Sequence, residues 1–384
     1  MKSSRIFSFI LQFSSLVVIA SLIVSGCQCP PDTCYDTDGG QCFNIDSFAM
    51  NIRKKMSDSC MGYGFVLYRR DSLQRFYNYG LKRTQANDGP LAFDNFSKVQ
   101  LASLSKTITA IATLQILNRK NLITYEKIKD YLPADWTLGP NVDKITFRDL
   151  LRHESGIRNT DSGYDGHTYG ELKGKIQGGV IDTNMGKQSY HNQNTALLRI
   201  IISKLLGYPH LAAGNDVYVA NNYIKYVQDS VLSHSAISKS YPYPDTASHQ
   251  YYYRWPYTGH KGAKFGDHTL YAGATGWFVS VTEYGSMINK LVNSEVLLKA
   301  NWRDTMLTHN LGCFDYGGPR GPYKWHNGFT GDSTAAGYGI VNTCWMYFPK
   351  NKVVAVCFAN SDIPNFGWFP GILAAAYDKS WITP

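Results

Sequence analysis

The chain has 384 residues, of which 44% are hydrophobic and 17% are charged. This composition excludes a disordered chain, and the length suits one large domain or two lobes that share a cleft. The formal net charge is +9, but the lysines and arginines are scattered and form no basic run. We interpret the charge as a weak preference for anionic surfaces such as a cell envelope. It does not indicate a nucleic-acid partner, and no feature of the sequence indicates an obligate protein partner.

The N-terminus is typical of an export signal. The basic start MKSSR precedes the apolar run IFSFILQFSSLVVIASLIV, and small residues then lead into Cys27. A basic segment, an apolar segment and small residues before a cleavage site characterise secretory signals. Small residues directly before a cysteine resemble a bacterial lipoprotein box. We predict a lipoprotein signal peptide at 1–26 and a lipid on Cys27, which would anchor an exported protein to the membrane of a bacterial cell envelope. An ordinary signal peptide and an uncleaved anchor are the alternatives.

The eight cysteines are interpreted as disulfide candidates before metal ligands, because export implies an oxidising compartment. Several of them precede the main domain, so residues 27–61 are predicted to be a cysteine-containing linker. No His/Cys pair follows at zinc-finger spacing, and we expect no metal. Cys344 and Cys357 flank Pro349–Lys352 symmetrically and would face each other across a hairpin. They form either a cross-strand disulfide or two buried thiols.

The main domain, predicted at 62–384, begins and ends with strands. Aromatic segments on either side of Asp71-Ser72 predict a hairpin at 62–80, and a helix follows at about 103–120. ITFRDLLRH starts another helix, and 160–275 is loop-rich with helical pieces such as NTALLRIIISKLLG. Thr282 is the expected N-cap of a helix ending near 292. YKWHNGF, AGYGIVNTCWMYF and KVVAVCFAN then predict strands, and FGWFPGILAAAYDKSW predicts a final helix.

This order predicts an α/β (α+β) fold with one sheet assembled from both ends of the chain and covered by helices. The helical, loop-rich middle of the chain would form a second lobe.

The stretch LASLSKTITAIATL places two serines and a lysine in the first turn of a helix that is otherwise apolar. Residues at i and i+3 share a helix face, so Lys106 can reach the Ser103 hydroxyl. A serine needs a nearby base to act as a nucleophile, and a lysine amine can be that base when burial disfavours its charged form. A helix N-terminus also stabilises a developing oxyanion. The alternative is a helix cap at Ser103 and a surface lysine at Lys106.

Two further motifs follow along the chain. Tyr190-His191-Asn192 lies just before a predicted helix, and His326-Asn327-Gly328 lies in a predicted strand. The three motifs together resemble those of the class C β-lactamase and penicillin-binding-protein group of serine hydrolases. LLRHESGI and GATGWFVSVTEYGSMI are similar to further segments of this family, and the resemblance covers roughly 62–380. It implies a β-lactamase/transpeptidase-like fold, with a central antiparallel sheet flanked by helices and a mainly helical second lobe.

The resemblance also implies a role for each matching residue, with no cofactor. Ser103 matches the nucleophile that forms an acyl-enzyme, Lys106 its base, and Tyr190 a second base that passes a proton to the leaving group. The residues matching substrate-binding or oxyanion positions are Asn192, His326, Asn327, Gly328 and Phe329, and the backbone N–H groups of Ser103 and Phe329 would form the oxyanion hole.

Several of these positions have alternatives. Tyr190 could be a core tyrosine, and His260-Lys261-Gly262 is a second His-x-Gly match without a following strand. His153 is interpreted as a packing residue. The run YYYRWPYTGH could line a pocket or pack between the lobes.

The third motif departs from the Lys-Thr-Gly that is usual in the β-lactamases and cell-wall peptidases of this family. Histidine is not a permanent cation at neutral pH, which weakens the case for gripping a substrate carboxylate. The sequence therefore favours a peptidase or amidase on D-amino-acid, cell-wall-like peptides, or an esterase, with a small peptide, amide or ester as substrate. A class C-type β-lactamase and an inactive lipid-anchored binding protein are the alternatives.

Overall fold

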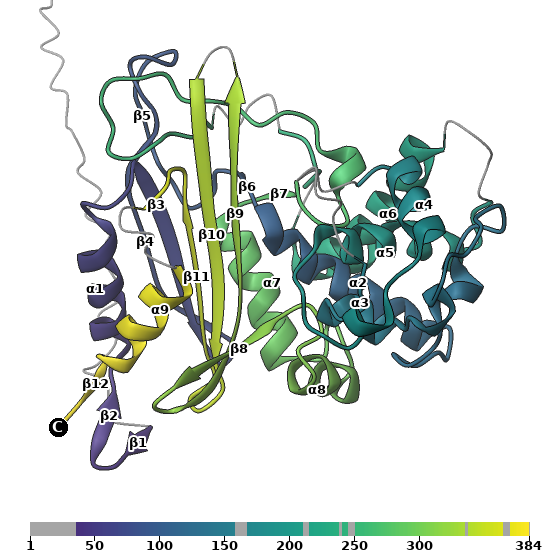
Figure 1. Ribbon diagram of the computed structural model, residues 1–384. Helices are drawn as coiled ribbons and strands as arrows, with labels where there is room; N and C mark the ends of the chain where they lie inside the picture. Colours follow the sequence, from purple (N-terminus) through teal and green to yellow (C-terminus); the bar gives the residue numbers. More distant parts are fainter. Residues whose placement is uncertain are drawn as a thin grey trace, which may run out of the picture.

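The computed structural model describes residues 36–157, 167–209, 215–237, 240–244, 250–334, 337–363 and 369–383. Its centre is a seven-stranded antiparallel sheet built from both ends of the chain (Figure 1). The strands lie in the spatial order β5 (Leu91–Ala92), β4 (Ser72–Arg83), β3 (Gly62–Arg69), β11 (Val353–Ala359), β10 (Gly337–Phe348), β9 (Gly321–Thr334) and β8 (Phe314–Gly318). The predicted hairpin at 62–80 and the three C-terminal strands are confirmed.

Helices cover both faces of this sheet. One face packs against α1 (Ile45–Met56) and α9 (Phe369–Asp378), and the other packs against α7 (Val281–Asn293) and the helical lobe (Figure 1). The central strands β3 and β11 are buried along nearly their whole length, because alternate side chains enter the two cores.

The second lobe is mainly helical, as the sequence predicts. It begins with a single 3-10 turn, η1 (Ala102–Leu104), that continues into a buried helix, α2 (Ser105–Arg119). The remaining helices are α3 (Phe147–Arg152), α4 (Tyr169–Gly178), α5 (Asn192–Leu205), α6 (Asp216–Val227) and α8 (Ala300–Thr308). Short strands form two smaller sheets. One has three strands, β1 (Thr37–Asp38), β2 (Gln41–Phe43) and β12 (Trp381–Ile382), and the other pairs β6 (Val99–Gln100) with β7 (Phe278–Val279).

The described part of the predicted linker 27–61 is not a linker. Residues 37–43 pair with each other and with the C-terminal β12, and α1 packs into the core that α9 shares. The apolar face of α1, which includes Phe48 and Ile52, explains why this segment folds onto the sheet. The domain therefore begins before residue 62. Cys42 is disulfide-bonded, whereas the predicted lipid site Cys27 lies outside the described residues.

Two local predictions can also be compared with the structure. The N-cap of α7 is Ser280 and not Thr282, because the Ser280 side chain accepts the Glu283 backbone N–H and the Glu283 carboxylate reaches back to cap Ser280. Cys344 and Cys357 lie directly opposite each other on β10 and β11, as their symmetry predicts. Both are buried free thiols, so the disulfide alternative is wrong.

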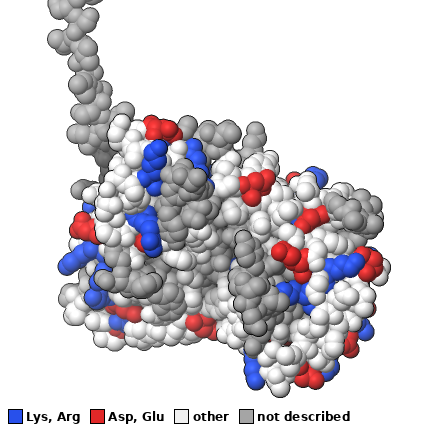
Figure 2. Space-filling view, turned by 45° about the horizontal axis from the view of Figure 1, so that its top comes forward, with Lys and Arg blue, Asp and Glu red and all other residues white. Residues whose placement is uncertain are grey.

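The surface charge agrees with the scattered basic residues of the sequence. On the face shown in Figure 2, basic and acidic side chains are interspersed over the molecule. Within the described residues, no helix has the length and hydrophobicity needed to span a membrane.

The packing of α1 generates a stability prediction. Phe48 is fully buried against Phe348 and Tyr377, so Phe48→Ala is expected to lower the free energy of unfolding by about 3–5 kcal/mol. Met50, on the same helix, is 64% exposed, and Met50→Ala is expected to change that free energy by less than about 0.5 kcal/mol. Urea denaturation of both variants measures the difference. Equal small effects would show that α1 is not part of the cooperative fold.

Candidate active site

Ser103 lies in a strained turn at the junction of the two lobes. The preceding residue, Ala102, has a φ of 48°, in the left-handed region that residues other than glycine rarely adopt. The buried Gln100 side chain holds this turn by accepting the Ala102 N–H at 2.7 Å. Among the described residues no side chain caps α2, so the alternative of Ser103 as a helix cap is wrong. Strain held by a specific buried partner is typical of functional sites.

Lys106 is fully buried beneath Ser103 and is not a surface lysine. Its Nζ donates a hydrogen bond to Ser103 Oγ at 2.9 Å and another to the Ala274 carbonyl at 2.8 Å. The structure therefore brings the candidate nucleophile and its candidate base into direct contact. Burial removes the water that would hydrate an ammonium ion, which suits a lysine that acts as a base.

Tyr190 lies beside the same lysine, immediately before α5. Lys106 Nζ is 5.0 Å from the centre of the Tyr190 ring, and the tyrosine is 45% exposed. The alternative of a core tyrosine is therefore wrong. The Tyr190 ring packs on the His153 ring with 4.5 Å between their centres. The structure thus places the first two motifs together.

The LLRHESGI segment fixes the loop that carries Tyr190. The His153 carbonyl accepts the Ser189 N–H at 2.8 Å, and the Ser155 hydroxyl donates to Asn194 Oδ1 at 2.5 Å. His153 itself is 2% exposed and packs against Tyr190, which agrees with its interpretation as a packing residue. These contacts explain why this segment accompanies the tyrosine motif in the sequence.

The third motif brings β9 close to the turn before Ser103. A side chain at Gly328 would place its Cβ 2.2 Å from the Leu101 carbonyl oxygen and 2.4 Å from Thr343 Oγ1. Thr343, opposite Gly328 on β10, donates to that same Leu101 carbonyl at 2.7 Å. Only glycine permits this approach, and the approach carries the next residue, Phe329, to the cleft.

Of the other two residues of this motif, His326 shares the strand face of Gly328 but is buried, and Asn327 lies on the opposite face. His326 is 1% exposed and packs against Phe314 behind Tyr190. Asn327 is paired with Cys344, whose side chain enters the core shared with α1 and α9, so Asn327 belongs to the opposite face of the sheet. Side chains alternate along a strand, which is why a three-residue motif cannot present all of them to one site.

A cleft of about 440 Å³ contains Ser103, Asn192 and Phe329. The two residues whose backbone N–H groups are the expected oxyanion donors, Ser103 and Phe329, thus border one cavity. The next two residues of β9, Thr330 and Gly331, continue the same wall. Beyond Phe314 the outer edge of β9 has no strand partner within the described residues, since β8 pairs only with 321–325.

The remaining lining residues of the cleft lie outside the three sequence motifs, although Thr275 belongs to the family-like segment GATGWFVSVTEYGSMI. His167 lies before α4, and the others come from the loop before β7: Phe265, Asp267, His268, Tyr271 and Thr275. The run 251–260 is not among the described residues that line the cleft; Tyr252 and Tyr253 are buried, and Tyr253 bridges to Ile340 of β10 and to Ser361. The second His-x-Gly match is structural, because a Cβ on Gly262 would meet the Tyr252 carbonyl oxygen at 2.6 Å.

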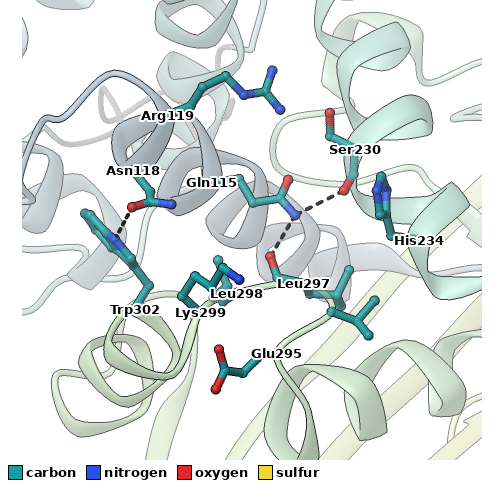
Figure 3. Close-up of a pocket in the computed structure, with 11 residues that line it drawn as sticks. Gln115, Asn118, Arg119, Ser230, His234, Glu295, Leu297, Leu298, Lys299 and Trp302 are labelled. Carbon is teal, nitrogen blue, oxygen red and sulfur yellow. Dashed lines mark hydrogen bonds between the residues drawn. The ribbon is translucent and has the colours of Figure 1, made fainter.

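A second cavity, of about 400 Å³, lies at the C-terminal end of α2 (Figure 3). There Gln115 donates to the Ser230 and Leu297 carbonyls, and Trp302 donates to Asn118. None of the predicted catalytic residues lines this cavity. Ser103, the predicted nucleophile, lines the first cleft instead.

The histidines near Lys106 are uncharged at neutral pH. Burial and the nearby Lys106 charge lower the pKa of His326 to about 3. Burial, together with the charges of Lys106 and His326, also lowers the pKa of His153 well below its ordinary value. A neutral His326 cannot replace the lysine of a Lys-Thr-Gly motif as a cation.

These shifts predict how stability depends on pH. The unfolded chain binds protons on these histidines near pH 6.5, whereas the folded chain keeps them neutral. Their contribution is therefore fully present above that pH, and the free energy of unfolding is expected to fall as the pH decreases toward about 3. Urea denaturation between pH 7 and pH 4 measures this slope. His326→Asn should make the slope shallower, and the same change at the exposed His234 should not. An unchanged slope in His326→Asn would contradict the prediction.

Comparisons with known proteins agree with this geometry. The family model described as Beta-lactamase matches residues 49–376. A putative penicillin-binding protein, PbpX of Bacillus subtilis (strain 168), is 27% identical over 171 residues, which is 44% of this chain and 39% of that protein. The chain thus matches less than half the length of this curated relative.

Solved structures show the same fold at lower identity. The β-lactamase/D-alanine carboxypeptidase of Pseudomonas syringae has a TM-score of 0.65 and 15% identity, with coverage of 87% of this chain and 98% of that one. The D-amino acid amidase of Ochrobactrum anthropi SV3, complexed with L-phenylalanine amide, has a TM-score of 0.67 and 14% identity, with the same coverage. The strained serine turn, the buried lysine and the family match together show that the chain belongs to the β-lactamase family of serine hydrolases.

Proposed function

We propose that the protein is a serine amidase or peptidase that acts on D-amino-acid, cell-wall-like peptides and amides, or on small esters. The observation that carries this proposal is the 2.9 Å contact between Nζ of the fully buried Lys106 and Ser103 Oγ. The similarity to a D-amino acid amidase and a D-alanine carboxypeptidase supports the substrate class.

The contacts suggest how the acyl-enzyme would form. Once Lys106 has lost its own proton, its Nζ accepts the Ser103 proton as Oγ attacks the substrate carbonyl carbon, and the carbonyl oxygen becomes an oxyanion. The N–H groups of Ser103 and Phe329 would hold that oxyanion. When the tetrahedral intermediate collapses, the bond to the leaving group breaks and Tyr190 gives its hydroxyl proton to the departing nitrogen or oxygen. Lys106, which lies close to Tyr190, then passes on the proton taken from Ser103 and restores the tyrosine hydroxyl. Water next attacks the acyl carbonyl carbon and gives a proton to Lys106; as this second intermediate collapses, the bond to Ser103 Oγ breaks, Oγ recovers that proton, and the carboxylic acid leaves.

A class C-type β-lactamase remains the second candidate within the family, and one observation weighs against it. Neutral His326 is buried behind Tyr190, and no Lys or Arg is among the described residues that line the cleft. Recognition of a β-lactam carboxylate would benefit from such a cation. The site therefore favours substrates that lack this carboxylate.

We also propose that the protein is exported and anchored by a lipid on Cys27 at the membrane of a bacterial cell envelope. The support is the basic, apolar and small-residue pattern of the first 26 residues together with the cysteine that follows. Such a position would give the cleft access to cell-wall peptides.

The proposed mechanism predicts covalent labelling of Ser103. Protein lacking residues 1–27 is expected to gain the mass of one fluorophosphonate less HF, because Ser103 Oγ displaces the fluoride, and a fluorescent penicillin should label it more slowly. Ser103→Ala should abolish labelling, and Lys106→Ala should slow it by at least about 100-fold because the base is lost. Intact mass spectrometry measures the adduct.

The variants also provide the control. Glu295→Gln, in the second cavity, should label at the wild-type rate. If folded protein is not labelled, or Ser103→Ala is labelled equally, the acyl-enzyme proposal is wrong and the inactive binding protein becomes the better interpretation. Rapid turnover of a cephalosporin would instead favour the β-lactamase alternative.

A further inference from the structure

The wall of the cleft opposite β9 has a chemical character that neither the sequence motifs nor the family match assigns. It combines the aromatic rings of Phe265, His268 and Tyr271 with the carboxylate of Asp267. Among the described residues that line the cleft, Asp267 is the one with an acidic side chain, and none is Lys or Arg. The charge of the described lining residues therefore favours a ligand that carries a positive charge.

We infer that Asp267 is a specificity residue that binds an ammonium group on the acyl portion of the substrate. The inference rests on the proposed acyl transfer to Ser103 and narrows its substrate class to amides, esters or short peptides with a free amine. Asp267 and Ser103 border the same cavity of about 440 Å³, so one small substrate can reach both. The aromatic rings beside the carboxylate add the kind of surface that attracts an ammonium ion.

Asp267 is held by its own loop and remains accessible. Its Oδ1 accepts the Thr269 backbone N–H at 2.7 Å, and the residue is exposed. One hydrogen bond to one oxygen orients the carboxylate and leaves further acceptor positions, since a carboxylate can accept several hydrogen bonds. A carboxylate already oriented by the backbone loses less entropy when it binds a ligand.

The loop that carries Asp267 is also tied to the catalytic helix. The same loop provides the Ala274 carbonyl that accepts a hydrogen bond from Lys106 Nζ at 2.8 Å. Three residues further on, the Trp277 N–H donates to Ser105 Oγ at 3.3 Å, and the Trp277 ring donates to the Ala272 carbonyl at 2.9 Å. These buried contacts fix the wall relative to Ser103, so the position of the carboxylate relative to the acyl group is defined.

The family's usual third motif works with the opposite charge. A Lys-Thr-Gly strand presents a cation and suits an anionic substrate, whereas this chain has a buried neutral His326 on β9 and a carboxylate on the facing wall. Both differences shift preference in the same direction, away from a substrate carboxylate and toward a substrate amine.

The experiment compares four p-nitroanilides at pH 7, where most aliphatic amines are protonated. D-Alanyl and Nα-acetyl-D-lysyl substrates carry an amine, Nα-acetyl-D-alanyl is neutral, and Nα-succinyl-D-alanyl carries a carboxylate. The readout is kcat/KM or, for a compound that is not turned over, its inhibition constant against fluorophosphonate labelling of Ser103. At least one amine compound should be preferred over the neutral one by about tenfold, and the succinyl compound should be the poorest.

Variants assign this preference to Asp267. Asp267→Asn should remove most of the roughly tenfold preference for the amine, and Asp267→Lys should shift preference toward the succinyl compound. Glu295→Gln removes a carboxylate from the second cavity and should keep the wild-type order. Thermal unfolding of each variant checks that it is folded.

The outcomes separate this inference from the proposed function. If Ser103 is labelled but the neutral or succinyl compound is preferred, or if Asp267→Asn keeps the amine preference, the inference is wrong and the acyl-enzyme proposal stands. If Ser103 is not labelled at all, the proposed function fails, and the inference that rests on it fails as well.

Discussion

The site depends on the close contact between two backbones, that of β9 at Gly328 and that of the turn at Leu101–Ala102. No other residue type fits at Gly328, and Thr343 locks the contact by donating to the Leu101 carbonyl. The contact forces a sharp change of direction at Ala102, which the buried Gln100 amide stabilises. As a result β9, which carries Phe329, and the helical lobe, which carries Ser103 and Lys106, border the same cleft. The proposed acyl transfer requires both, so it depends on this close contact.

The charge environment of the site follows from burial. Lys106 is enclosed, and burial together with the Lys106 charge lowers the pKa of His153 and His326, so both histidines are neutral at neutral pH. The hydroxyls of Thr107 and Thr109 on α2 are satisfied by carbonyl groups in the core. A helix with polar residues on a buried face is thereby stabilised by specific hydrogen bonds, and its polar groups gain fixed positions. Because the surroundings of Lys106 are enclosed, differences between substrates are recognised at the exposed wall that carries Asp267.

Much of this arrangement could be predicted from the sequence, because strand and helix periodicity and three short motifs carry it. The hairpin at 62–80, the C-terminal strands and the opposed pair Cys344 and Cys357 are local or symmetric features, and these predictions are confirmed. The proximity of Ser103, Lys106 and Tyr190 follows from motif order once the fold is assumed, and the structure has them together.

Some features were missed although the sequence carries a signal for them, and others depend on tertiary contacts. The linker prediction for 27–61 overlooked the apolar stripe of α1, which indicates a packed helix. The cap of α7 was misplaced by two residues, although Ser280 and Glu283 have the spacing of a capping box. Asn327 was expected in the pocket but lies on the strand face opposite to His326 and Gly328, and His326 is buried behind Tyr190. Asp267 has no motif around it, and only the folded wall shows its position.

The order of strands in the sheet has a consequence for how the chain folds. The central strand β11 is formed by residues 353–359 and pairs with β3 at 62–69, so the middle of the sheet joins segments separated by most of the chain. β12 likewise pairs with β2 near the other end. Such a high contact order delays formation of the core until nearly the whole chain has been synthesised, and it slows folding afterwards. A chain that remains unfolded during synthesis can still be threaded across a membrane, which is the state that export of this protein would require.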